Sequence, residues 1–99
     1  MNDKFFSLLG LAYRAKKITT GEELVLKAVR RKQTSLVIMS TDVSESTAKK
    51  IRSKCEYYDV ALCEIGTREQ LGGAIGKESR ALLAVLDKGF SKKLSELLG

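Results

Sequence analysis

The 99-residue sequence has no histidine, no proline and no tryptophan, and it has only two cysteines. Without histidine, the chain lacks the commonest general base and the commonest metal ligand. Cys55 and Cys63 are eight positions apart with no partner pattern around them, so neither a zinc site nor a redox pair is predicted. We expect both to be reduced, partly buried thiols. These absences favour a protein without a catalytic site, a metal or a cofactor.

Long hydrophobic runs are absent as well. No stretch approaches the roughly 20 apolar residues that a membrane span needs, and residues 5–12 are too short and interrupted for a signal peptide. We therefore expect a cytoplasmic protein with no membrane partner. At 43% hydrophobic residues the chain can still bury a core, but its length suits one domain and not two. The sequence predicts a single domain over residues 1–99, and we expect a monomer.

Positive charge is in excess and is unevenly distributed. The chain has 18 Lys and Arg against 12 Asp and Glu, a net charge of +6. Residues 1–33 hold eight bases and three acids, whereas residues 34–66 hold four bases and five acids. A basic field of this kind favours a polyanionic partner, of which nucleic acid is the commonest. The alternative is a protein-interaction module that presents its basic face to an acidic protein.

Five segments have the spacing of amphipathic helices. The first covers residues 5–12, and Gly76 ends the fourth. The last four helices each begin at a residue that is common at helix N-termini: Gly21, either Asp42 or Ser44, Thr67 and Asp87. In the fifth helix we expect four apolar side chains to face inward: Phe90, Leu94, Leu97 and Leu98.

Four shorter segments read as strands, over residues 18–20, 36–39, 60–63 and 81–86. Residues 36–39 and 81–86 are continuous apolar runs, which predict strands that are covered on both faces and are central in the sheet. Helices and strands alternate along the chain. This order predicts an α/β fold in which a sheet lies between two layers of helices.

The second helix carries the most informative pattern. Lys16 and Lys17 lie just upstream of it, and Leu24 lies between its buried and its charged face. Gly21 leaves the helix N-terminus open, so free N–H groups could meet a phosphate or a base edge. The charged face holds four residues: Glu23, Lys27, Arg30 and Arg31. An ordinary solvated face, with Glu23 and Lys27 as an ion pair, explains the same residues.

Two features that suggest catalysis have simpler explanations. The segment from residue 72 to residue 79 fails as a phosphate-binding loop, because Leu71 stands where the motif needs glycine. Lys77 is also followed by Glu78, not by the Ser or Thr that would hold magnesium. Asp42 and Asp87 each follow a predicted strand, yet each also precedes a helix, so capping explains them. The hypothesis of a small enzyme is disfavoured.

Three segments together resemble a known family: LLGLAYRAKKITTGEELVLKAVR (8–30), TDVSESTAKKI (41–51) and GTREQLGGAIGKESRALLAVLDKGF (66–90). The chain is similar to the small bacterial YlxQ-type proteins of the kink-turn-binding ribosomal protein superfamily (large-subunit protein seven-Ae and its relatives). The resemblance implies an α/β/α sandwich with a mixed sheet of about four strands, and no catalysis. It also implies a role in the ribosome or another ribonucleoprotein particle, in translation, through binding of kink-turns. Kink-turns are sharply bent RNA helices with tandem sheared G·A pairs.

The resemblance also assigns roles to residues. The superfamily motif Gly-x-Asn-Glu-x-x-Lys contacts the G·A pairs, and here Glu23 stands in place of Asn and Leu24 in place of Glu. It implies that Gly21, Glu23 and Leu24 approach base edges. The residues implied to hold phosphates are Lys16, Lys17, Lys27, Arg30 and Arg31. The loop that would close over the bulged nucleotide, usually apolar in tight binders, is here Lys77, Glu78, Ser79 and Arg80.

Overall fold

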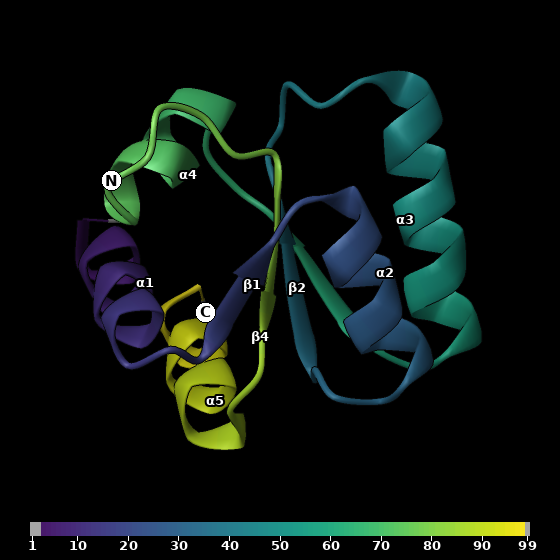
Figure 1. Ribbon diagram of the computed structural model, residues 1–99, viewed down its shortest axis with the longest axis horizontal. Coiled ribbons are helices and arrows are strands. Elements are labelled where there is room, and N and C mark those ends of the chain that lie inside the picture. Colours follow the sequence, from purple (N-terminus) through teal and green to yellow (C-terminus); the bar gives the residue numbers. More distant parts are fainter. Residues whose placement is uncertain (1–2, 99) are drawn as a thin grey trace.

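The computed structural model describes residues 3–98, in which helices and strands alternate (Figure 1). In chain order the elements are α1 (Asp3–Arg14), β1 (Ile18–Thr20), α2 (Glu22–Arg30), β2 (Leu36–Met39), α3 (Glu45–Tyr57), β3 (Ala61–Glu64), α4 (Arg68–Ala74), β4 (Leu82–Val85) and α5 (Lys88–Leu97). Every helix and strand predicted from the sequence is present, with ends that differ by a few residues.

The strands form one mixed sheet in the order β1-β4-β2-β3. Strand β4 pairs antiparallel with both β1 and β2, and β2 pairs parallel with β3. Every residue of β2 and β4 is buried. The prediction that the two apolar runs are the central strands is therefore confirmed. Strand β3 lies at one edge and starts one residue later than predicted.

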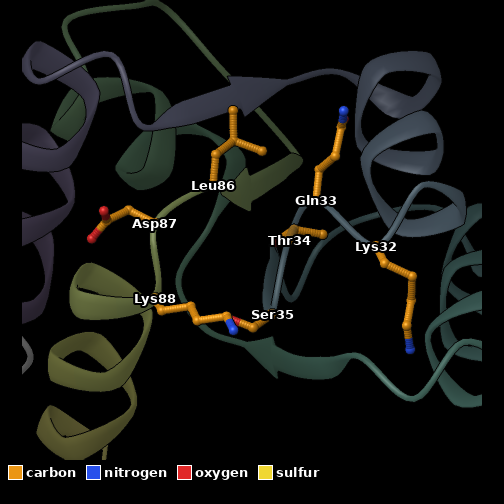
Figure 2. A pocket seen from close by; sticks show the side chains of 7 residues that line it. All are labelled: Lys32, Gln33, Thr34, Ser35, Leu86, Asp87 and Lys88. Carbon is orange, nitrogen blue, oxygen red and sulfur yellow. The ribbon is translucent and has the colours of Figure 1, made fainter.

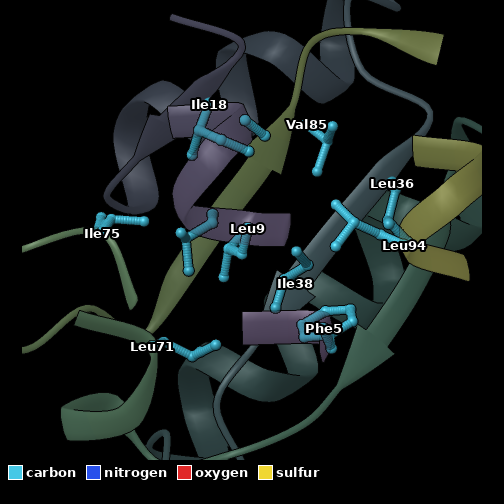
Figure 3. Close-up of a cluster of buried hydrophobic side chains, with 11 residues drawn as sticks. Phe5, Leu9, Ile18, Leu36, Ile38, Leu71, Ile75, Val85 and Leu94 are labelled. Atoms are coloured by element: carbon cyan, nitrogen blue, oxygen red, sulfur yellow. The ribbon is translucent and has the colours of Figure 1, made fainter. Parts of the chain in front are cut away.

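Helices cover both faces of the sheet, as Figure 1 shows: α1, α4 and α5 lie on one side, and α2 and α3 lie on the other. Alternate residues of β2 point to opposite faces. Leu36 and Ile38 enter the core under α1, α4 and α5, where they meet Phe5 and Leu9 (Figure 3). Val37 enters the core under α2 and α3. The predicted α/β/α sandwich is confirmed.

The prediction for the fifth helix is wrong at its last turn. Leu94 is fully buried and Phe90 is half-buried, but Leu97 and Leu98 are 38% and 37% exposed. Leu97 lies beside Leu8 in a groove between α1 and α5. The last turn of α5 thus lies at the border between two helices and is partly open to solvent.

Side-chain caps fix where three of the helices begin. Ser44, not Asp42, caps α3, because its hydroxyl accepts a hydrogen bond from the Thr47 N–H (3.3 Å). Thr67 caps α4 in a capping box, and Asp87 caps α5 by accepting from the Phe90 N–H (2.9 Å). Helix α2 has no side-chain cap, since Gly21 occupies its N-cap position.

Over residues 3–98, none of the helices combines the length and the apolar character that crossing a membrane requires.

Candidate nucleic-acid interface

Gly21 opens the N-terminus of α2. Its backbone has φ 94° and ψ 149°, a conformation that is strained for any residue with a side chain. The Gly21 N–H donates to the carbonyl of Leu82 (3.1 Å), which fixes the start of α2 beside the start of β4. A Cβ placed on Gly21 would meet no atom within 4 Å. The first N–H groups of α2 have no partner within the helix and no capping side chain, so they remain open to a ligand.

The side chains around this opening are exposed and can contact a ligand. Glu23, Leu24 and Lys27 are exposed, and Leu24, although apolar, is 52% exposed. Within residues 3–98 the ion pairs are Lys50–Glu22, Arg52–Glu64 and Arg68–Asp42. The ion pair between Glu23 and Lys27 that an ordinary solvated face would contain is therefore not formed.

The loop between α4 and β4 lies beside the start of α2. The Arg80 N–H donates to the Arg68 carbonyl (3.0 Å), which holds the end of the loop against α4. Two residues later, Leu82 receives the hydrogen bond from Gly21. In Figure 1 this loop and the first turn of α2 occupy the same end of the sheet, at the top of the view. We call these residues the proximal surface: Gly21, Glu23, Leu24, Lys77, Glu78, Ser79 and Arg80.

Lys77 turns toward α1. Its ammonium group lies 6.0 Å from the centre of the Tyr13 ring, at the outer limit of a cation–π contact. The positive charge of Lys77 therefore remains available to a polyanion that reaches this side of the proximal surface.

Gly72 positions the loop, a role that was not predicted from the sequence. A Cβ on Gly72 would lie 2.6 Å from the Cα and 2.7 Å from the N of Ser79. The Gly72 carbonyl also accepts a hydrogen bond from the Lys77 N–H (2.8 Å). The backbone of the loop thus lies directly on α4 at a position that only glycine can occupy. The available indication in the sequence was a glycine pair inside an amphipathic helix.

Gly72→Ala is expected to lower the free energy of unfolding by about 1–3 kcal/mol, because the methyl group must displace the backbone of the loop. Gly73→Ala is the matched control, since a Cβ on Gly73 meets nothing within 4 Å. The control should be neutral or stabilising, because alanine favours a helix over glycine. Urea unfolding of both variants measures the difference. Equal stabilities would mean that the loop yields freely at Gly72.

Four of the bases predicted to hold phosphates lie at the other end of the sheet. Strand β1 separates Lys16 and Lys17 from Gly21, and the Lys17 carbonyl accepts from the Leu86 N–H, just past β4 (2.7 Å). From Leu82 to Leu86 a strand covers about 13 Å. Arg30 and Arg31 end α2 at a similar distance from its start. Lys27 lies between the two groups, so the predicted site is divided along α2.

Within residues 3–98, the two thiols and the acidic side chains do not gather into a further site. Cys55 is buried and Cys63 is half-buried, and both are free. Burial raises the pKa of Cys55, and burial together with the charge of Glu64 raises the pKa of Cys63 to about 11. Both therefore remain protonated at neutral pH. In the described part of the chain, no three His, Cys, Asp or Glu side chains gather as metal ligands would.

Known proteins resemble this chain in sequence and in structure over almost its whole length. Residues 3–95 match the model of the ribosomal protein L7Ae/L30e/S12e/Gadd45 family. The RNA-binding protein YlxQ of Bacillus subtilis (strain 168) is 47% identical over 95 residues, which cover 96% of this chain and 95% of that protein. A solved structure of a protein with unknown function from Bacillus halodurans C has a TM-score of 0.94 at 48% identity, over 96% of each chain. The Giardia lamblia 15.5kD RNA binding protein shares the fold, with a TM-score of 0.82 at 22% identity over 95% of this chain and 81% of that one.

Proposed function

The chain belongs to the ribosomal protein L7Ae/L30e/S12e/Gadd45 family, and from this premise we propose that it is an RNA-binding protein that recognises kink-turns or kink-turn-like RNA. Residues 1–99 act as one binding domain, as a monomer, in the cytoplasm. The RNA belongs to the ribosome or to another ribonucleoprotein particle that serves translation. The protein binds and carries out no catalysis.

The observation that carries this proposal is the open N-terminus of α2. Unpaired N–H groups and the positive end of the helix dipole attract phosphates and acceptor atoms of bases. Because Gly21 has no Cβ, the backbone can approach the RNA closely. No neighbouring side chain fills the space in front of Gly21. A ligand can therefore reach the helix end directly.

The side chains of the proximal surface have complementary roles. The carboxylate of Glu23 only accepts hydrogen bonds, so it suits the amino group of a guanine. Leu24 offers an exposed apolar contact to a base or sugar. Lys27 lies further along the helix and binds a phosphate. Lys77 and Arg80 close over the bulged nucleotide from the other side.

A direct test is a titration of the wild-type protein with two RNAs. One contains a kink-turn, and the other is the same helix with its G·A pairs replaced by Watson–Crick pairs. Each mismatched position costs about 1–3 kcal/mol in a specific interface, so we expect at least about tenfold tighter binding of the kink-turn. Equal affinities would contradict kink-turn recognition, and binding of neither RNA would contradict the whole proposal.

Glu23→Asn is expected to tighten kink-turn binding about three- to tenfold. The substitution removes a negative charge that repels nearby phosphates, and it adds an N–H donor for a base edge. The same titration with both RNAs measures the effect. Glu96→Gln is the control, because it removes one negative charge from an exposed position on α5, in the opposite layer. Weaker binding by Glu23→Asn would show that the carboxylate itself reads the guanine.

A further inference from the structure

A pocket of about 130 Å³ opens at the end of the sheet opposite the proximal surface (Figure 2). It is lined by residues 32–35, which lead into β2, and by residues 86–88, which follow β4. Figure 2 shows the Lys88 side chain extending toward Ser35. The Asp87 carboxylate, the acidic group of this lining, is occupied by the N–H of Phe90 at the start of α5. The pocket therefore presents the exposed side chains of Lys32, Ser35 and Lys88 to solvent.

More bases gather around this pocket. The backbone hydrogen bond between Leu86 and the Lys17 carbonyl places Lys16 and Lys17 beside it, and Arg30 and Arg31 directly precede Lys32. The ion pairs within residues 3–98 involve other bases, so the charges of this group are not neutralised by acidic side chains. A concentration of uncompensated positive charge favours a polyanion.

An exposed aromatic ring lies at the same end of the sheet as these Lys and Arg side chains. Tyr57 is 80% exposed, although it ends α3 beside a half-buried neighbour, Tyr58. The two rings meet edge to face, with centroids 4.8 Å apart, an arrangement that aromatic pairs favour. The Lys32 ammonium group donates to the Tyr58 carbonyl (2.7 Å) and so ties this end of α3 to the basic group. A ring of this kind is a platform on which an unpaired base can stack.

We propose that this end of the molecule binds a single-stranded segment of RNA, separately from the proximal surface. We call it the distal surface, and its residues are Lys16, Lys17, Arg30, Arg31, Lys32, Tyr57 and Lys88. The proposal extends the proposed RNA-binding function to a second site. Stacking on Tyr57 requires an unpaired nucleobase, which double-stranded RNA does not offer. The Lys and Arg side chains of the distal surface would bind the phosphates of the same strand.

The dimensions of the protein allow both surfaces to be occupied at once. The molecule measures 30 × 27 × 24 Å, and the two surfaces lie at opposite ends of the central strands. A kink-turn at the proximal surface and a single strand at the distal surface would therefore contact different residues. One protein molecule can hold a folded RNA and a single strand, either from the same RNA or from another one.

The test measures the binding of a labelled oligouridine of about 12 nucleotides, a length typical of single-strand sites. We expect the wild type to bind it both alone and when saturated with kink-turn RNA. Tyr57→Ala should weaken this binding about tenfold, whereas Tyr57→Phe should retain it, because a stacked base needs the ring and not the hydroxyl. Replacing Arg30, Arg31 and Lys32 together by Gln should weaken it by about tenfold or more.

The control is a triple substitution with the same loss of charge at exposed positions that are not part of the distal surface: Lys4→Gln, Lys49→Gln and Lys93→Gln. It should change the affinity for oligouridine by less than about threefold, because the charges lie outside the contact. An equal effect of both triple variants would overturn the proposal, since only net charge would then matter. No effect of Tyr57→Ala would overturn it as well, and so would binding of polyglutamate but not of oligouridine, which would point to an acidic protein partner.

Two further outcomes separate this proposal from the proposed function. Loss of oligouridine on saturation with kink-turn RNA, together with loss in Gly21→Val, would mean that the protein has a single RNA site and would overturn the distal surface. Conversely, a protein that fails to distinguish a kink-turn from its Watson–Crick control, but binds oligouridine in a manner that depends on Tyr57, would support the distal surface and contradict kink-turn recognition.

Discussion

Gly21→Val is expected to weaken kink-turn binding by about a hundredfold or more and to leave oligouridine binding unchanged. A Cβ at this position meets nothing within 4 Å in the free protein, so the valine side chain projects outward into the space that the RNA would occupy. It then holds the RNA away from the free N–H groups of α2. Hydrogen bonds to charged groups are worth about 1.5–3 kcal/mol each, so the loss of two accounts for the expected factor. Titration with the kink-turn and with its Watson–Crick control measures it.

Backbone strain at Gly21 needs its own control. At φ 94° any side chain is strained by about 1–3 kcal/mol, so the variant will also be less stable than the wild type. Gly21→Ala shares this strain but adds only a methyl group, and we expect it to retain more of the kink-turn affinity than Gly21→Val. If the two variants lose stability equally and differ in RNA binding, the effect is steric. Wild-type affinity in Gly21→Val would place the site elsewhere.

Lys27→Ala distinguishes a phosphate contact from a base contact. A phosphate contact carries no direct sequence information, so this variant should weaken the kink-turn and the Watson–Crick control by a similar factor. A selective loss of the kink-turn would assign Lys27 to base recognition instead.

Much of the fold could be predicted from local patterns. Residues 36–39 form a central strand because every side chain is apolar, which only a strand covered on both faces tolerates. Thr67 and Asp87 mark helix starts because their side chains accept N–H groups of the first turn. The position of β4 between β1 and β2 had no such pattern, because pairing between distant segments leaves no periodicity in the sequence. The prediction for Leu97 was wrong because its exposure depends on how α5 packs beside α1, which the periodicity of a single helix does not show.

The candidate site could be predicted only in part. Gly21 followed from the helix that begins there, and the loop that includes Lys77 followed from the resemblance to a known family. The separation of the Lys and Arg side chains into two groups could not be predicted, because Lys17 is only four positions from Gly21 in the sequence. The intervening strand β1 carries the chain from one end of the sheet to the other. Four residues of extended chain therefore separate Lys17 from Gly21 by about 13 Å.

The affinity for kink-turn RNA should fall by about a hundredfold between about 50 and 200 mM salt. Each phosphate that the protein neutralises releases condensed counterions, and about four such contacts give this dependence. Lys27, Lys77 and Arg80, on the proximal surface and beside it, supply three of these contacts, and the positive N-terminus of α2 supplies the fourth. Titrations at several salt concentrations give the slope of log affinity against log salt concentration. A nearly flat profile would mean that these Lys and Arg side chains do not contact phosphates.

The same measurement separates the two surfaces. Lys27→Gln should reduce the magnitude of the kink-turn slope by about one, because it removes one phosphate contact. The combined replacement of Arg30, Arg31 and Lys32 by Gln should leave the kink-turn slope nearly unchanged and reduce that of oligouridine by about two to three. If the triple variant instead reduces the kink-turn slope by the same amount, the kink-turn extends along α2 to its C-terminal end. In that case the Lys and Arg side chains at both ends of the sheet bind a single RNA molecule.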